Sequence, residues 1–366
     1  MERIRNRVTD PALKGILQKL QDGRRLDFED GMALFATPDF LGLGAMANDV
    51  KEQKTGEDAY FVVNRQINPS NICVLSCKFC EFAAKKGDSK AYEMSLDEIL
   101  ARCGDDVAEV HIVGGLHPDW PFDVYLDIVR TIRKNFPRIQ IKAYTAVEVD
   151  FFSRIAKLSV EKVLERLREA GMDTMPGGGA EVFSERVKKD LFPQKIGAEP
   201  WLRIHRLAHR MGIRSNATLL YGHIETREER VRHMLLLRDL QDETHGFLSF
   251  IPLSFQVGTT QIVDRPASAM EDLRTIAVAR LLLDNFVHIK AYWVMLGLDV
   301  TAMALNFGAD DLDGTIGKET IAHMAGADSP AGLTRNFLVG MIREAGRVPV
   351  VRDGLYNKLE VIGSVA

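Results

Sequence analysis

Three cysteines, Cys73, Cys77 and Cys80, lie close together in the segment NICVLSCKFC. Thiolates at this spacing can each bind a different iron of a cubane iron–sulfur cluster. Clusters that only carry electrons normally have four cysteine ligands. A cluster held by three leaves one iron open to a small molecule. The C-x3-C-x2-C spacing therefore predicts a reactive iron–sulfur centre.

Zinc is the alternative occupant of such a trio. Structural zinc sites take four ligands, commonly two cysteine pairs or a cysteine pair with a histidine pair. The remaining cysteine, Cys103, stands further along the chain in a helix-like run, and it is more simply a buried structural thiol. A zinc site would have to recruit a distant histidine. Four cysteines in so long a chain do not form a disulfide framework. Free thiols are typical of a reducing compartment.

The composition excludes several classes of partner. The chain has 366 residues, a net charge of −4 and 46% hydrophobic residues. A dedicated nucleic-acid binder would normally present a basic face. The N-terminal segment lacks the apolar core of a signal peptide, and no run of about 18 apolar residues occurs anywhere. We therefore expect a cytoplasmic protein with no nucleic-acid partner and no membrane partner.

From about residue 59, β-rich segments alternate with amphipathic helical segments. The expected strands are 60–66, 108–113, 140–145, 173–175, 215–220, 247–251, 289–294 and, more weakly, 310–313. This alternation implies parallel pairing through right-handed crossovers. Eight strands close most economically into an α/β fold of the TIM type, a (β/α)8 barrel of about 250 residues. The predicted organisation is an N-terminal helical extension (1–58), the barrel (59–326) and a C-terminal helix and tail (327–366).

Polar and glycine-rich residues follow at least six of these strands. The active site of such a barrel lies at the C-terminal ends of its strands. The cysteine segment follows the first strand, Gly114 and Gly115 follow the second, and Glu148 follows the third. A Pro-Gly-Gly-Gly-Ala-Glu segment that ends at Glu181 follows the fourth. This layout predicts one shared site.

Each of these features also has a plainer interpretation. The glycine pair would be an ordinary tight turn, and the two glutamates would be surface carboxylates. His117 and His223, which follow the second and fifth strands, are either loop histidines or catalytic groups. The glycine-rich segment 176–179 could cradle a phosphate, but no Lys-Ser or Lys-Thr follows it as a P-loop requires.

Polar residues also alternate within the first predicted strand. Asn64, Gln66 and Asn68 share one face, because side chains alternate along a strand. They would either point into the barrel mouth and bind a polar substrate, or face solvent and loop backbone.

The chain resembles the radical S-adenosylmethionine (SAM) enzymes, in the branch that makes menaquinone through futalosine and that includes the halves of the deazaflavin-forming synthase. The resemblance extends from about Gly42 to Tyr356. It is carried by the segments NRQINPSNICVLSCKFCEFA, HIVGGLHPDWPF, KAYTAVEVDFF, GMDTMPGGGAEVF and LLYGHIET.

This resemblance implies a [4Fe-4S] cluster on the three cysteines, with SAM bound to the fourth iron. It places Gly114 and Gly115 at the methionyl amine of SAM, and Phe79 belongs to the cysteine signature. Of Glu148 and Glu181 at the strand ends, one carboxylate would contact the amine or the ribose of SAM. An acidic residue usually follows the glycine pair, but here the next residue is Leu116. The main chain or another carboxylate must therefore contact the SAM amine.

Within this branch the segments resemble the aminodeoxyfutalosine synthases most closely. Their reaction adds the 5′-deoxyadenosyl radical to 3-[(1-carboxyvinyl)oxy]benzoate, and rearrangement and decarboxylation then give 6-amino-6-deoxyfutalosine. The dehypoxanthine futalosine cyclases, in which the radical abstracts hydrogen and ring closure follows, are the alternative. A non-catalytic iron–sulfur or zinc protein is the alternative from another class.

The synthase interpretation also implies partners and substrate-binding residues. The reducing electron would come from a donor such as flavodoxin or ferredoxin. The substrate carries two carboxylates, which call for cationic or multi-donor groups. The candidates are His117 and His223 as catalytic residues and Asn64, Arg65, Gln66 and Asn216 as substrate-binding residues.

Overall fold

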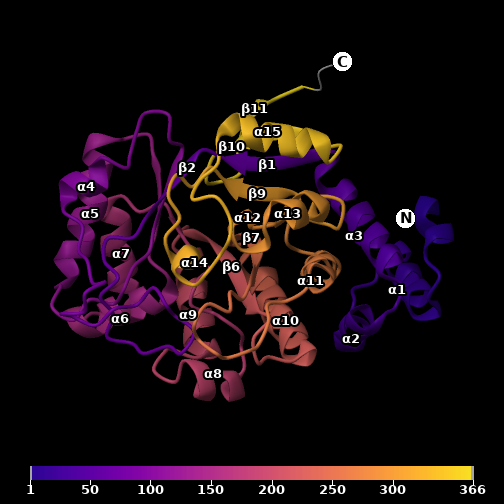
Figure 1. Ribbon diagram of the computed structural model, residues 1–366, viewed down its shortest axis with the longest axis horizontal. Coiled ribbons are helices and arrows are strands. Elements are labelled where there is room, and N and C mark those ends of the chain that lie inside the picture. The colour runs from indigo at the N-terminus through magenta and orange to yellow at the C-terminus, as the bar shows by residue number, and fades with distance from the viewer. Residues whose placement is uncertain (1, 364–366) are drawn as a thin grey trace.

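A curved parallel sheet of seven strands forms most of the barrel wall in the computed structural model, which describes residues 2–363 (Figure 1). The strand order is β2-β3-β4-β5-β6-β7-β8, and every neighbouring pair is parallel. Its strands are β2 (Asn64–Ile67), β3 (Glu109–Ile112), β4 (Gln140–Ala143), β5 (Thr174–Met175), β6 (Arg214–Tyr221), β7 (Phe247–Ser254) and β8 (His288–Ile289).

A second sheet closes the gap between β8 and β2. Its order is β11-β10-β1-β9, with β1 (Asp58–Val62), β9 (Asp311–Gly314), β10 (Val348–Arg352) and β11 (Lys358–Val361). Strand β1 pairs in parallel with both β9 and β10 and continues into β2 after a single residue. A bridge between Lys290 and Asp311 joins the end of β8 to β9. The chain thus has the predicted TIM-like α/β fold, and the weakly predicted eighth strand is the one that closes it.

Three strand predictions need correction. The first strand is divided into β1 and β2, because the two halves bind different neighbours. The segment predicted as a strand over 289–294 leaves the sheet early: the Lys290 amide bonds Phe250, the Ala291 amide already bonds Asp311, and α12 (Trp293–Leu296) follows. Strands β10 and β11 were not predicted, although Val-Pro-Val-Val between two glycine turns is a β-branched run typical of a strand.

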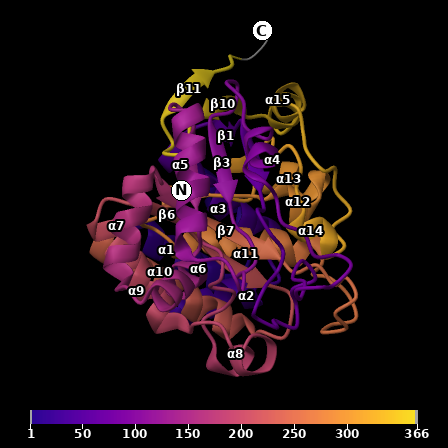
Figure 2. The same cartoon turned by 90° about the vertical axis from the view of Figure 1, so that its left-hand side faces the viewer.

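Amphipathic helices cover the outside of the sheets (Figures 1 and 2). In α7, for example, Val160, Val163, Leu164 and Leu167 are buried on one face, Ser159 caps the N-terminus, and Gly171 ends the helix with a positive φ. The longer crossover helices are α5 (Phe122–Asn135), α6 (Ala146–Ala156), α7 (Val160–Ala170), α9 (Ala198–Arg210), α10 (Arg227–Thr244) and α11 (Ala269–Leu282). The shorter helices are α4 (Leu96–Leu100), α8 (Glu185–Leu191), α13 (Leu298–Ala304) and α14 (Ile321–Met324).

The two ends of the chain are built onto this barrel. As predicted, the N-terminal segment is helical: α1 (Pro11–Gln21), α2 (Phe28–Ala36) and α3 (Phe40–Thr55) form a layer in which α2 and α3 pack on α10 and α11. The predicted C-terminal helix is α15 (Arg335–Glu344), and it packs on β10. The proposed domain limits at residues 58 and 326 stay predictions. No helix within residues 2–363 combines the length and apolar character that crossing a membrane requires.

Buried charges hold the closing strands together. Arg352 of β10 donates two hydrogen bonds, of 2.5 and 3.2 Å, to the carboxylate of Asp311 on β9. Both side chains are buried, and Asp311 raises the pKa of Arg352 against the effect of burial. A charge left alone in this interior would carry a large desolvation cost. The pair therefore makes the closure depend on both strands.

The cysteine loop (residues 68–95) docks on the barrel by backbone contacts. Gly115, after β3, donates its amide to Ser70 O at 2.8 Å, and Val74 donates to Leu116 O at 3.0 Å. A Cβ on Gly115 would lie 2.2 Å from Ile72 O, so only glycine permits this approach. Gly115 therefore allows the cysteine loop to pack directly against the turn after β3.

We expect Arg352→Met to lower the free energy of unfolding by about 3–5 kcal/mol, because it leaves the Asp311 carboxylate buried and unpaired. Arg335→Met is the matched control: Arg335 of α15 pairs with Glu360 of β11 at the surface, and such pairs contribute roughly 0–1 kcal/mol. Denaturant unfolding of both variants gives the comparison. Equal effects of the two substitutions would contradict the role of the buried pair.

We expect Gly115→Ala to displace the cysteine loop, at a cost of about 1–3 kcal/mol or more for the steric overlap. The thiols of the loop should then react faster with an alkylating reagent. Gly340→Ala is the control, since its added Cβ would meet nothing within 4 Å and alanine favours a helix. Unchanged thiol reactivity in Gly115→Ala would show that the close contact does not position the loop.

Candidate functional site

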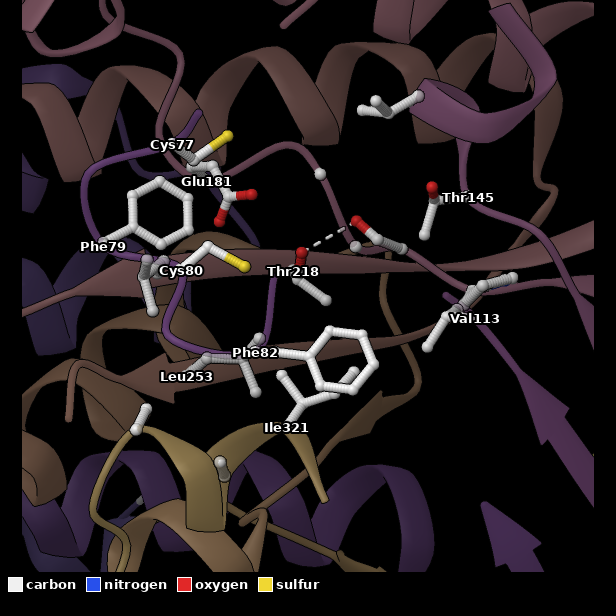
Figure 3. Close-up of a pocket in the computed structure, with 18 of the residues that line it drawn as sticks. Cys77, Phe79, Cys80, Phe82, Val113, Thr145, Glu181, Thr218, Leu253 and Ile321 are labelled. Carbon is white, nitrogen blue, oxygen red and sulfur yellow. Dashed lines mark hydrogen bonds between the residues drawn. The ribbon is translucent and has the colours of Figure 1, made fainter. Parts of the chain in front are cut away.

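A cavity of about 330 Å³ opens at the C-terminal ends of the barrel strands. Its walls come from the cysteine loop, from the strand ends and from the segment around α14 (Figure 3). The residues expected after the first four predicted strands meet here, and Leu220 of β6 and Leu253 of β7 also line the cavity, so the predicted shared site exists as one cavity.

Cys73, Cys77 and Cys80 all line this cavity, and all are half-buried free thiols. Burial raises the pKa of the Cys77 thiol to about 11 and also raises that of Cys80. The nearby ammonium of Lys195 acts in the opposite direction on both. Thiolates at these positions are therefore favoured only when cations balance them. Cys103 does not line the cavity, and its Sγ contacts Ile99 O at 3.6 Å, as expected of a structural thiol.

The donor chemistry of the three cysteines suits a cubane cluster. Within residues 2–363, no group of three or more His, Cys, Asp or Glu side chains is placed to hold a single metal ion. A cubane does not need such convergence, since each thiolate binds a different iron. The ammonium of Lys85 donates to the carbonyl oxygens of Cys73, Val74 and Leu75 at 2.7–3.2 Å. This cation fixes the start of the loop and leaves the sulfur atoms facing the cavity.

Lys195 is a site residue that the sequence did not reveal. It lies in the loop after α8 and forms an ion pair of 2.5 Å with Glu181 Oε1. Its ammonium also lies 5.0 Å from the centre of the Phe79 ring. Figure 3 shows Phe79 and Glu181 beside Cys77 and Cys80 on one side of the cavity. Glu181 is therefore at the predicted place, but its charge is already paired.

Glu148 lies next to the glycine pair. Its Oε1 accepts from the Gly114 amide at 3.1 Å, and its Oε2 accepts from the amide and hydroxyl of Thr145 at 2.7 and 2.8 Å. Thr145 caps α6, and Glu148 completes the capping box. Burial raises the pKa of Glu148 to about 7 despite these bonds. Gly114, Gly115 and Glu148 all line the cavity, so the structure places a carboxylate beside the glycine pair, where Leu116 offers none.

The floor of the cavity is polar. Gln66 and Asn216, two of the predicted substrate-binding residues, line it. Four further residues of the floor were not predicted: His111, Lys142, Lys290 and Asp313. A signal for the two lysines was present, because both stand in the tetrapeptide Ile-Lys-Ala-Tyr, at 141–144 and again at 289–292. A lysine inside a buried strand is rarely unpaired.

The two predicted catalytic histidines do not line the cavity. His117 stacks on Trp120, and its Nε2 lies 3.0 Å from Glu93 Oε1. His223 accepts the Ile224 amide at Nδ1, 2.8 Å away, and its Nε2 contacts Leu220 O at 3.1 Å. The rings therefore order their own loops.

Asn64 and Arg65 also lie outside the cavity. Asn64 Oδ1 accepts the amide of Ile316 and so ties β2 to the segment after β9. Arg65 points to the opposite face of β2, where its guanidinium donates to Thr315 Oγ1 at 3.2 Å and lies near Asp106. The alternation of the strand turns this side chain away from the site.

Comparison with known proteins agrees with this geometry. Residues 67–237 match the model of the radical SAM superfamily, and residues 244–365 match that of the CofH/MqnC C-terminal region. Aminodeoxyfutalosine synthase of Thermus thermophilus is 47% identical over 97% of this chain and 98% of its own. Cyclic dehypoxanthine futalosine synthase of Streptomyces coelicolor is 38% identical over 97% of this chain and 91% of its own.

The fold has solved relatives. Methylornithine synthase superposes with a TM-score of 0.70 at 17% identity, over 91% of this chain and 97% of its own. The family uses a [4Fe-4S] cluster together with SAM, and the three cysteines occupy the corresponding motif region. The chain belongs to the radical SAM superfamily of enzymes, in the group that contains the aminodeoxyfutalosine synthases.

Proposed function

We propose that the chain is an aminodeoxyfutalosine synthase, which joins the adenosyl group of SAM to 3-[(1-carboxyvinyl)oxy]benzoate with loss of one carboxylate. The observation that carries this proposal is a single cavity that unites three cysteines, a glycine–carboxylate pair and a polar floor with two lysines. A high identity to the Thermus synthase over nearly the whole chain supports the synthase above the cyclase.

The residues of the chain have distinct tasks in this reaction. When bound, the [4Fe-4S] cluster supplies the electron that cleaves SAM. Cys73, Cys77 and Cys80 would hold it, and Lys195 would balance part of the negative charge of the thiolates. Ionised Glu148 would accept a hydrogen bond from the amino group of SAM beside Gly114, where its carboxylate is already oriented by three hydrogen bonds.

Apolar side chains form much of the wall between the cysteines and the floor. Phe82, Val113, Leu253 and Ile321 project into this region (Figure 3). A primary carbon radical attacks most C–H bonds, so the alkene must be held near it and water must be kept out. An apolar wall keeps water out while the polar ends of the cavity orient the two substrates.

The proposed electron donor is flavodoxin or ferredoxin, and the proposed location is the cytoplasm. Four lysines of the cysteine loop are exposed: Lys78, Lys85, Lys86 and Lys90. The same loop exposes Asp88 and Glu93, and Lys86 already pairs with Asp119, so Lys78, Lys85 and Lys90 are the ammonium groups that an acidic donor protein would contact. Free thiols suit a reducing compartment.

Anaerobic reconstitution tests the cluster assignment. We expect Cys73→Ala, Cys77→Ala and Cys80→Ala each to abolish SAM cleavage, because the cubane loses a ligand. Cys103→Ala should retain it, since this thiol lies outside the cavity. Iron analysis and quantification of methionine provide the readouts. Full activity in any of the first three variants would overturn the cluster site.

Product analysis tests the synthase assignment. With SAM, a reductant and the enolpyruvyl benzoate, the protein should yield an adenosylated product in a 1:1 ratio with methionine, detected by mass spectrometry. Normal SAM cleavage that releases only 5′-deoxyadenosine would reject the synthase and favour the cyclase.

The raised pKa of Glu148 gives a pH dependence. Below about pH 7 the carboxylate is protonated and no longer offers an anionic acceptor to the SAM amino group, so SAM should bind roughly tenfold more tightly at pH 8 than at pH 6. Glu148→Gln should bind weakly at both values. Equilibrium dialysis without reductant measures the effect. An equal pH dependence in the variant would show that another group titrates.

A further inference from the structure

Two lysines on the cavity floor retain unused hydrogen-bond donors. Lys142 of β4 and Lys290, directly after β8, are almost fully buried and line the cavity. Lys142 Nζ donates to Glu109 Oε1 at 2.7 Å, and Lys290 Nζ donates to Asp313 Oδ1 at 3.0 Å. An ammonium has three donors. Within residues 2–363 neither lysine has another hydrogen-bond partner, so each keeps two N–H groups.

Tyr292 and His111, two neutral side chains of this floor, also have unused hydrogen-bonding atoms. Tyr292 OH accepts from Gln66 Nε2 at 2.9 Å, and its own proton has no acceptor within residues 2–363. His111 pairs in register with both Gln66 and Lys142, so these residues form one layer across the barrel. The Nε2 atom of His111 is buried without a partner. Buried polar groups are normally paired, and a ligand could pair the donors of this layer.

Most of the unpaired hydrogen-bonding atoms in this layer are donors. Each lysine forms an ion pair with one carboxylate, and Arg352 forms a third ion pair with Asp311. Within residues 2–363 one acceptor of these pairs, Glu109 Oε2, is buried without a hydrogen-bond partner. The fixed charges are therefore balanced, yet the spare atoms include four lysine N–H groups and one tyrosine O–H group. A planar carboxylate, with two acceptor oxygens, suits such a set of donors better than an amine or a neutral ring.

The chemistry of the substrate decides which of its carboxylates lies here. One carboxylate is attached to the alkene, which must lie next to SAM and the cysteines. The other is on the benzoate ring, at the far end of the molecule. Lys142 stands inside the barrel within β4, whereas the cysteines lie on a loop beyond the strand ends. The remote carboxylate therefore reaches the floor, with its ring against the apolar wall.

We propose that Lys142, Lys290 and Tyr292 bind the ring carboxylate of the substrate and thereby select an aromatic acid. The identity of the substrate rests on the proposed function. The two lysines are substrate-binding residues, and their partners Glu109 and Asp313 position them.

The first test uses the protein with no mutation. Calorimetry on reconstituted protein with SAM and no reductant compares two unreactive probes, 3-(1-carboxyethoxy)benzoate and the benzamide that replaces its ring carboxylate. The benzoate should bind roughly 10- to 150-fold more tightly, as expected for hydrogen bonds to a charged group. Equal affinity would overturn the proposal.

The second test uses variants. Lys142→Met and Lys290→Met should each bind the benzoate less tightly while affinity for the benzamide changes little, so the preference falls. The double variant Lys142→Met/Glu109→Gln removes a whole pair and avoids a lone buried carboxylate; it should show the same loss. Lys51→Met is the control, because Lys51 is equally buried, bonds Gly56 O at 2.8 Å and lies outside the cavity.

The two proposals fail in different ways. A wild-type preference for the benzoate that persists in all the Lys142 and Lys290 variants would overturn the lysine site alone. Turnover of the enolpyruvyl benzoate with equal binding of both probes would do the same. If the wild-type protein binds neither probe and forms no adenosylated product, the proposed substrate is wrong, and the lysine site for it falls as well.

Discussion

The backbone contact between the cysteine loop and the turn after β3 is the constraint on which the site depends. The loop is long and has little regular structure, so its cysteines need an external support. Gly115 provides it by allowing Ile72 and Ser70 to approach the barrel main chain directly. The same turn presents the Gly114 amide to Glu148. One close contact thus sets both the cysteine positions and the carboxylate proposed to bind SAM.

The interior of the barrel is unusually rich in charge. Ion pairs join β3 to β4, the end of β8 to β9, and β9 to β10. Such pairs are costly to bury, and well-packed apolar residues often give equal or greater stability. Their position below an open cavity suggests a different use, because they hold ammonium groups ready for an anion. On this account, the buried lysine–carboxylate pairs are kept because their lysines bind the substrate, and not because they stabilise the fold.

The sequence predicted the fold and the chemistry of the site better than it predicted the details of substrate binding. Strand alternation and the cysteine spacing are local patterns, and both were informative. The interactions of His117 with Glu93 and of Lys195 with Glu181 join residues far apart in sequence or in loops without periodicity. Arg65 was a candidate because of its positive charge, but the alternation of β2 turns it away from the face that Gln66 presents to the cavity. The repeated Ile-Lys-Ala-Tyr segments were visible but had no meaning until both lysines lay in one cavity.

The central claim is that the adenosyl carbon of SAM becomes part of the product. SAM labelled with ¹³C at the 5′ carbon of its ribose tests this directly by NMR of the products formed with the enolpyruvyl benzoate. If the claim is right, the labelled carbon is bonded to a carbon derived from the alkene. A labelled methyl group in 5′-deoxyadenosine, with no label in a larger product, would contradict it.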